Sequence, residues 1–141
     1  MTPDEPVVLV DALNVMRSRW PNIPEERFVE LLREWAEHEG LRVIAVFDGH
    51  APGGSLGVHE LDGRTSIVGT GRETADDWIA DHAGEIAPDG HLLWLVSSDR
   101  ELRRRVAGHA ERVIGGGSFA GRLLSRPTGE GEESADGGDD E

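Results

Sequence analysis

The chain has 141 residues and carries 28 acidic residues against 14 basic ones, so its formal net charge is −14 at pH 7. This acidic composition argues against strong non-specific binding to nucleic acid, which requires a cationic surface, although a local basic patch stays possible. The sequence contains no cysteine, which excludes disulfide bonds and thiolate metal sites.

The first predicted element is a buried strand over Val7–Val10, an apolar run that ends directly at Asp11. A helix is predicted over about Pro24–Glu39, because apolar residues recur there at the spacing of one helix face. A second apolar strand covers Leu41–Phe47 and ends at Asp48. A carboxylate at the end of a buried strand is costly to desolvate. An aspartate in this position after more than one strand therefore requires an explanation.

The second half of the chain continues the alternation of strands and helices. Two short alternating runs flank Asp62-Gly63 and predict a β-hairpin. We then expect a helix over Thr74 to about Ile86, a strand over Leu92–Val96, a short helix from Arg100 to about Gly108, a strand at Arg112–Ile114 and a closing helical turn or two over residues 118–125. The strand at 92–96 is also followed, after two serines, by an aspartate, Asp99.

The C-terminal segment differs in composition from the rest of the chain. From Arg126 onward it is rich in glycine and acidic residues and almost free of apolar ones. We therefore predict one folded domain over residues 1–125 and a disordered tail over residues 126–141. The sequence shows neither a signal peptide nor an apolar run of the roughly 18 residues that a membrane span needs. We expect a cytoplasmic protein with no membrane partner, and the oligomeric state is left open.

Near-continuous apolar strands separated by helices indicate a mainly parallel sheet with helices on both faces. The predicted fold is therefore a three-layer α/β/α fold. Ligands of such sheets bind beyond the carboxyl ends of the strands. Asp11, Asp48 and Asp99 each follow one of the predicted strands, so the topology gathers them along that edge.

A fourth carboxylate can be chosen from the predicted helix that starts near Thr74. Its apolar stripe is formed by Ala75, Trp78, Ile79, Ala83 and Ile86. Asp76 lies on the border of this stripe at the start of the helix, where it can reach a protein-lined site. Asp77 and Asp81 point away from the stripe, and Thr74 and Asp77 match a capping box.

Several carboxylates on one edge repel each other unless a cation neutralises them. Mg²⁺ prefers oxygen ligands and retains waters, and such a site can generate hydroxide and stabilise a phosphate transition state. Cleavage of a nucleic-acid backbone, with DNA not excluded, is the chemistry that this predicts. Other open-sheet enzymes fit less well, because the chain lacks the Asp-x-Asp of dehalogenase-type phosphatases, the lysine of receiver domains and a P-loop. We interpret the glycine run at Gly115–Ser118 as a turn.

The motifs resemble a known family. They are VDALNV with Asp11 and Asn14, VFDG with Asp48, ETADDWI with Asp76 and VSSDREL with Asp99, and their order and spacing resemble the YacP-like NYN family of the PIN-like nuclease superfamily. The resemblance covers about Val7 to Leu124 and implies a PIN-like fold and a metal-dependent endoribonuclease that uses Mg²⁺ or Mn²⁺. It implies RNA as the substrate and, because studied bacterial members include a ribosome-associated nuclease, the ribosome as a further partner.

The same resemblance implies a role for each acidic residue. Asp11, Asp76 and Asp99 would bind the metal. Asn14 would orient a ligand or the attacking water, and Asp48 would assist by a direct or water-mediated contact. The chain departs from the family at Ala12-Leu13, where a glycine–aromatic pair is usual, so one aromatic side chain is missing near the site.

Basic residues near these motifs are candidate substrate contacts. Arg100 and Arg103 follow Asp99 and could contact phosphates, or they could form a solvated helix face. Arg17 is a second candidate phosphate contact, and His50 is a candidate substrate contact in the loop after the second strand.

Most acidic candidates also have a structural alternative. Asp99 could cap the helix that follows it, and Asp48 could be a turn residue before a glycine. Asn14 could cap a helix, and Asp76 could complement a helix dipole. Asp11 has no obvious structural role. Two other functions therefore stay open: a catalytically inactive RNA- or ribosome-binding module, and a phosphatase that acts on a small phosphoester.

Overall fold

The structure, a computed structural model, describes residues 6–19, 22–86 and 92–124, so the predicted tail lies outside the described residues. The strands are β1 Val7–Asp11, β2 Arg42–Phe47, β3 Gly57–Glu60, β4 Thr65–Gly69, β5 Leu93–Val96 and β6 Arg112–Ile114. The α-helices are α1 Ala12–Arg19, α2 Glu25–Glu39, α3 Ala75–Ile86, α4 Arg100–Val106 and α5 Gly116–Leu124, and a short 3-10 helix covers Pro52–Gly54. The predicted elements are present, with ends that differ by one or two residues.

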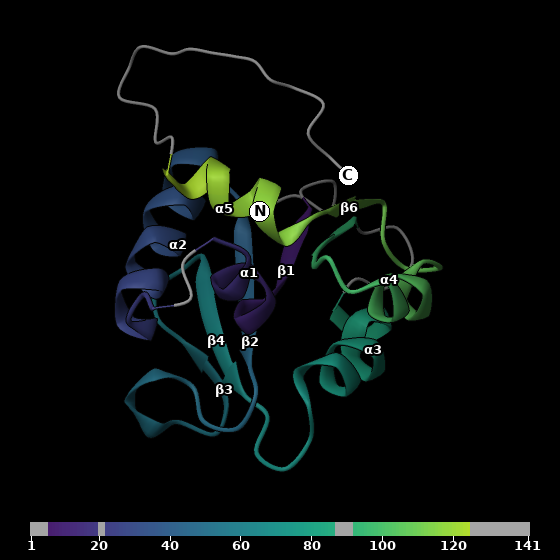
Figure 1. Cartoon of the computed structure of the whole chain (residues 1–141), viewed down its shortest axis with the longest axis horizontal. Coiled ribbons are helices and arrows are strands. Elements are labelled where there is room, and N and C mark those ends of the chain that lie inside the picture. The colour runs from purple at the N-terminus through teal and green to yellow at the C-terminus, as the bar shows by residue number, and fades with distance from the viewer. Residues whose placement is uncertain (1–5, 20–21, 87–91, 125–141) are drawn as a thin grey trace.

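The six strands form one sheet in the order β3-β4-β2-β1-β5-β6 (Figure 1). All neighbouring strands are parallel except β3 and β4, which form the predicted antiparallel hairpin. The chain builds outward from β1 to β2 and β4 on one side, and later adds β5 and β6 on the other. The strand order therefore reverses at β1, and the carboxyl end of β1 is the topological switch point where such sheets bind ligands.

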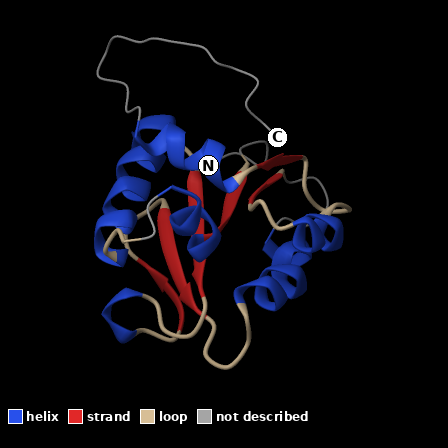
Figure 2. Cartoon of the chain, in the orientation of Figure 1, coloured by secondary structure: helices blue, strands red, loops and turns tan. Residues whose placement is uncertain are grey.

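Helices cover both faces of the sheet, which confirms the predicted three-layer α/β/α fold (Figure 2). Alternate residues of β1 serve the two cores: Val8 and Val10 pack with α1, α2 and α5, whereas Val7 and Leu9 pack with α3 and α4. Because β1 is buried on both faces, its sequence is a continuous apolar run rather than an alternating one.

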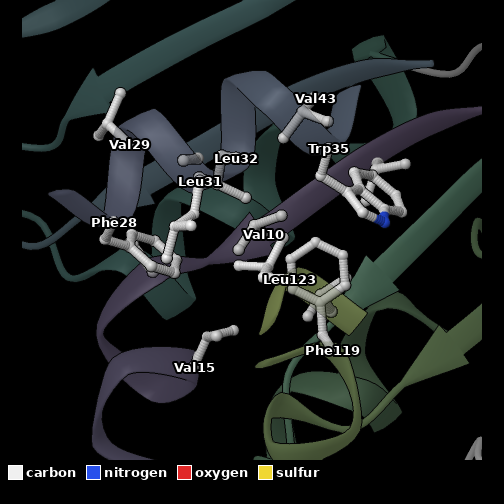
Figure 3. Packing of buried hydrophobic residues seen from close by; sticks show 14 of the residues in the cluster. Val10, Val15, Phe28, Val29, Leu31, Leu32, Trp35, Val43, Phe119 and Leu123 are labelled. Carbon is white, nitrogen blue, oxygen red and sulfur yellow. The ribbon is translucent and has the colours of Figure 1, made fainter. Parts of the chain in front are cut away.

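The larger core is organised by aromatic side chains from α2 and α5. Trp35 and Phe119 pack edge to face with ring centroids 5.0 Å apart, beside Val10 and Leu123 (Figure 3). The predicted apolar face of α2 is buried in this core. The helix ends at Gly40, whose φ of 72° is the left-handed conformation that closes a helix.

Helix α1 is an α-helix that the sequence analysis missed. It begins at Ala12, directly after β1, so no turn residues separate strand and helix. Its buried residues Ala12, Val15 and Met16 are too few to give a clear helical pattern. Asn14 therefore lies inside a helix rather than in a loop.

The glycine run at Gly115–Ser118 is a second difference from prediction. We predicted a turn, but α5 begins at Gly116, so the run is mostly the first turn of a helix. The close packing of α5 against α1, described below, explains why glycine is needed there. None of the helices in the described ranges is long and apolar enough to cross a membrane.

Candidate active site

The structure brings the four predicted aspartates to the carboxyl edge of the sheet. Asp11 ends β1, Asp48 follows β2, Asp99 follows β5 after two serines, and Asp76 lies in the first turn of α3. Asp11 is coupled electrostatically to Asp76 and Asp48, and Asp76 is coupled to Asp99 and Asp48. The four carboxyl groups therefore form one charge cluster, which we call the carboxylate edge.

Asp11 is the most buried member of the carboxylate edge, with only 5% of its surface exposed. Burial, followed by repulsion from Asp76, raises the pKa of its carboxyl group to about 6. The hydroxyl of Ser97 and the backbone N–H of Asn14 oppose this shift, because both stabilise the charged form. Asp11 thus retains its proton to a much higher pH than an ordinary aspartate.

Asp76 is half-buried beside Asp99. Burial raises its pKa, and so do the nearby charges of Asp99 and Asp48. The side chain of Asp99 lies close enough to Asp76 to raise the Asp76 pKa further, because two neighbouring carboxylates cannot both be charged without repulsion. Arg105 acts in the opposite direction, but its guanidinium forms an ion pair with Asp77 at 3.0 Å.

None of the four carboxylates forms an ion pair with a basic side chain in the part of the chain that the structure describes. Arg105, which is paired with Asp77, acts on the edge only from a distance, so the negative charge of the edge is not neutralised by a contacting basic side chain. This is the electrostatic condition under which an external cation binds favourably.

Ser97 joins two members of the edge and was not identified from the sequence. Its buried hydroxyl donates to Asp11 Oδ2 at 3.1 Å and accepts from the Asp99 backbone N–H, also at 3.1 Å. Asp99 in turn caps α4, because its Oδ1 accepts from the Leu102 N–H at 3.1 Å. The predicted capping role of Asp99 is confirmed, and it leaves the second carboxylate oxygen available.

Asn14 connects three segments behind the edge. Its Oδ1 accepts from the Ser98 N–H at 2.9 Å, and Ser98 Oγ accepts from the Gly116 N–H at 2.8 Å. A Cβ at Gly116 would lie 2.5 Å from Asn14 Oδ1, so only glycine allows α5 to approach this closely. Asn14 therefore holds α1, the loop after β5 and the start of α5 together.

Asp48 reaches across the edge to the start of α3. The residue is exposed, yet its Oδ1 accepts a short hydrogen bond from the Ala75 backbone N–H, one residue before Asp76. Gly49, directly after it, has a φ of 77°, which supports the predicted tight turn. Asp48 thus contributes both charge to the edge and a contact that positions α3.

The basic residues predicted to contact the substrate differ in their exposure to solvent. Arg17, Arg100 and His50 are exposed, and none of them is in an ion pair within the described residues. Arg103 is half-buried, and its Nε donates to the backbone oxygen of Ser97 at 2.8 Å. Arg103 therefore supports the loop that carries the carboxylate edge, whereas the other cations point to solvent.

The carboxyl oxygens of the edge are the ligand type that a divalent cation such as Mg²⁺ requires. Within the described ranges, no three His, Cys, Asp or Glu side chains form a preformed metal-binding group. Mg²⁺ does not require one, because it typically binds through one or two carboxylates together with waters and substrate phosphates. The neighbouring carboxyl groups of Asp76 and Asp99, together with the buried carboxyl of Asp11, fit that chemistry.

Residues 8–123 of the chain match the sequence model of the YacP-like NYN domain. The fold is similar to that of Rae1 (YacP) from Bacillus subtilis, with a TM-score of 0.65, 20% identity, and coverage of 84% of this chain and 74% of that chain. A tryptophan-to-leucine mutant of the same protein gives a TM-score of 0.62 and 22% identity, with coverage of 84% of this chain and 72% of that chain. At these identities the likeness shows the fold alone. No curated protein matches the chain significantly.

Proposed function

The chain belongs to the YacP-like NYN domain family of PIN-like nucleases, and from this premise we propose that it is a metal-dependent endoribonuclease that hydrolyses RNA phosphodiester bonds. The observation that carries the proposal is the uncompensated carboxylate edge. Its most buried member, Asp11, has a pKa raised to about 6 by burial and by Asp76. Folding gathers like charges there at a cost, and a divalent cation removes that cost.

We assign Asp11, Asp76 and Asp99 to metal binding, with Mg²⁺ or Mn²⁺ as the ion. When bound, the cation would lower the pKa of a coordinated water and stabilise negative charge on the phosphate. Ser97 would hold the Asp11 carboxylate through its hydrogen bond to Oδ2. Asp48 would keep the start of α3 in place through Ala75, and Asn14 would fix the loop that leads to Asp99.

Exposed cations support RNA as the substrate. Arg17 on α1 and Arg100 on α4 belong to elements that begin at the carboxyl edge, and both are available for phosphates. His50 lies in the loop after Asp48, where it could contact a base or a phosphate. Arg103 contributes indirectly, through its hydrogen bond to Ser97. A cytoplasmic location and the ribosome as a partner are proposed from the family resemblance alone.

The alternative is a catalytically inactive RNA- or ribosome-binding module. One observation favours it: the described residues contain no preformed group of three metal ligands. The two functions differ in whether the carboxylate edge binds a cation when RNA is present.

The deciding experiment measures Mn²⁺ binding by calorimetry, with and without a phosphorothioate RNA oligonucleotide that resists cleavage. We expect the wild type to bind Mn²⁺ and Asp11→Asn to lose that binding while remaining folded. The matched control is Asp62→Asn, which changes an aspartate at the opposite edge of the sheet. A folded wild type that binds no Mn²⁺ under either condition, yet still binds RNA, would support the inactive module instead.

Cleavage is then assayed on the same three proteins, with RNA alone and with translating ribosomes. Activity of the wild type and the control, with none for Asp11→Asn, is the expected pattern. Turnover of small phosphoesters without any cleavage of RNA would instead identify a phosphatase.

A further inference from the structure

We propose that Thr70 is a positioning residue that sets the placement of Asp48 relative to Asp76. The inference rests on the proposed function, because both aspartates belong to the proposed site. Thr70 follows β4 and lies in the segment that leads into α3. No sequence motif identifies it, and within the described residues it forms no hydrogen bond to the aspartate carboxylates.

Thr70 holds the turn that carries Asp48. Its backbone N–H donates to the Phe47 carbonyl at 3.1 Å, and its Oγ1 accepts from the Gly49 N–H at 3.1 Å. These two partners are the residues directly before and after Asp48. The Asp48 backbone is therefore held from both sides by one threonine.

Thr70 also holds the start of α3. Its Oγ1 donates to the Glu73 carbonyl at 2.5 Å, and its carbonyl accepts from the Glu73 N–H at 3.3 Å. Glu73 lies three residues before Asp76, so the hydroxyl of Thr70 links the Asp48 turn directly to the lead-in of the Asp76 helix. The half-buried hydroxyl uses both its donor and its acceptor capacity in this link.

Two neighbouring contacts close the same junction. Asp48 Oδ1 accepts from the Ala75 N–H, so the carboxylate itself touches the start of α3. A Cβ at Gly69 would lie 2.2 Å from the Ser55 carbonyl oxygen and 2.8 Å from the Ala51 nitrogen. The loop after Asp48 is thus packed directly on the backbone that precedes Thr70, and the junction leaves little freedom for Asp48 to move.

The hydroxyl of Thr70 is tested by Thr70→Val, which preserves the side-chain shape and removes both hydrogen bonds. Outer-shell partners of metal ligands typically change metal affinity by about 10- to 100-fold. Thr70 acts one contact further from the proposed ligands, through the Asp48 turn and the residues before α3. We therefore expect Thr70→Val to weaken Mn²⁺ binding by about 10-fold, the low end of this range, and Thr70→Ser, which keeps the hydroxyl, to retain wild-type affinity. Rescue by serine separates the hydroxyl from the side-chain methyl group.

A second readout does not depend on metal binding. The amide proton of Ala75 reports the hydrogen bond to Asp48, and NMR should show it shifted upfield in Thr70→Val but unchanged in Thr70→Ser. The matched control is Thr65→Val, the same substitution in β4, where the buried Oγ1 has no hydrogen-bond partner among the described residues. This control should change neither Mn²⁺ affinity nor the Ala75 amide.

The outcomes separate this inference from the proposed function. A wild type that binds no Mn²⁺ would remove the nuclease proposal, while the Ala75 amide would still show whether Thr70 positions Asp48. An unmoved Ala75 amide in folded Thr70→Val, or an equal loss of affinity in Thr70→Ser, would overturn the inference. Should Thr70→Val not fold, it is repeated in the Thr65→Val background, and failure there too would show that the role of Thr70 is purely structural.

Discussion

The pKa values of two aspartates at opposite edges of the same sheet are shifted in opposite directions. Asp62 lies in the β3–β4 turn at the amino edge, where it accepts from the N–H groups of Arg64 and Thr65 at 2.8 and 2.9 Å and from Arg33 Nε at 2.9 Å. Burial raises its pKa, but these hydrogen bonds outweigh burial and hold the pKa below the ordinary value. Asp11 at the carboxyl edge has carboxylates as neighbours, and its pKa is raised to about 6.

The difference shows that an aspartate near a strand end is not informative by itself. At the amino edge every donor needed by the carboxylate comes from the protein, so Asp62 stabilises a turn and requires no ligand. At the carboxyl edge the protein supplies further negative charge. An arrangement that costs folding free energy in this way is expected where a ligand completes the site.

Of the substitutions predicted, Asp99→Asn should have the largest effect, a strong reduction of RNA cleavage. Unchanged cleavage would contradict the difference between the two edges of the sheet. We expect RNA cleavage to fall by at least about 100-fold, the upper range for outer-shell metal partners, because a proposed ligand is lost. The fold should persist, since asparagine also caps helices and can keep the bond to the Leu102 N–H. Cleavage rates and thermal unfolding measure the two effects.

The control for this prediction is Asp62→Asn, which should cleave RNA at the wild-type rate. Wild-type cleavage by Asp99→Asn would reduce Asp99 to a helix cap and would remove it from the proposed site.

Asp11 should make the protein less stable as the pH rises. The folded state retains the Asp11 proton to about pH 6, whereas the unfolded chain loses it near the ordinary pKa of 3.8. The folded state therefore binds more protons between these values, and the free energy of unfolding falls across that window by up to about 3 kcal/mol. Urea unfolding of the metal-free protein at a series of pH values measures this loss.

Asp11→Asn should remove that pH dependence. We expect the variant to match the wild type near pH 4 and to be more stable by up to about 3 kcal/mol at pH 7. An identical pH profile for variant and wild type would mean that Asp11 does not carry the charge penalty.

Asp62→Ala tests the aspartate at the amino edge of the sheet, which the protein itself stabilises. The variant loses two hydrogen bonds from backbone N–H groups, so we expect the free energy of unfolding to fall by about 1–2 kcal/mol at pH 7. The exposed ion pair with Arg33 should add little. Because the pKa of Asp62 is lowered, its contribution is present above its ordinary pKa and is lost as the pH falls, which is opposite to Asp11. Urea unfolding at pH 3 and 7 would show the opposite sign.

Thr65→Val should have the smallest of these effects, on the free energy of unfolding. It allows two threonines near the two ends of β4 to be compared. The buried hydroxyl of Thr65 has no hydrogen-bond partner among the described residues, whereas Thr70, just beyond the other end of the strand, uses its hydroxyl twice. Replacing the Thr65 hydroxyl with a methyl group should raise the free energy of unfolding by about 1 kcal/mol. A decrease, measured by thermal or urea unfolding, would mean that the hydroxyl is satisfied.

Much of the fold could be predicted because its signals are local. Apolar runs indicated the central strands, helical spacing indicated α2 and α3, and the Asp62-Gly63 pair indicated the hairpin. Helix α1 was missed because it starts directly after β1 and buries few residues. The start of α5 was missed because glycines that allow close packing resemble glycines that form a turn.

Which carboxylates lie at the carboxyl edge could be predicted from the amino-acid sequence alone. Strands end at Asp11, Asp48 and Asp99, and parallel strands bring their carboxyl ends together whatever their order. Their catalytic and metal-binding roles remain predictions.

The contacts that hold these carboxylates in place could not be predicted in this way, because they form between segments that are distant in the sequence. Ser97 and Asp11 are 86 residues apart, and the Thr70 hydroxyl joins segments that no local pattern connects. Such hydrogen bonds depend on which strands become neighbours and on how closely the loops that follow them approach each other. An apolar run or a helical period encodes neither, since those patterns report the burial of each residue and not its partner.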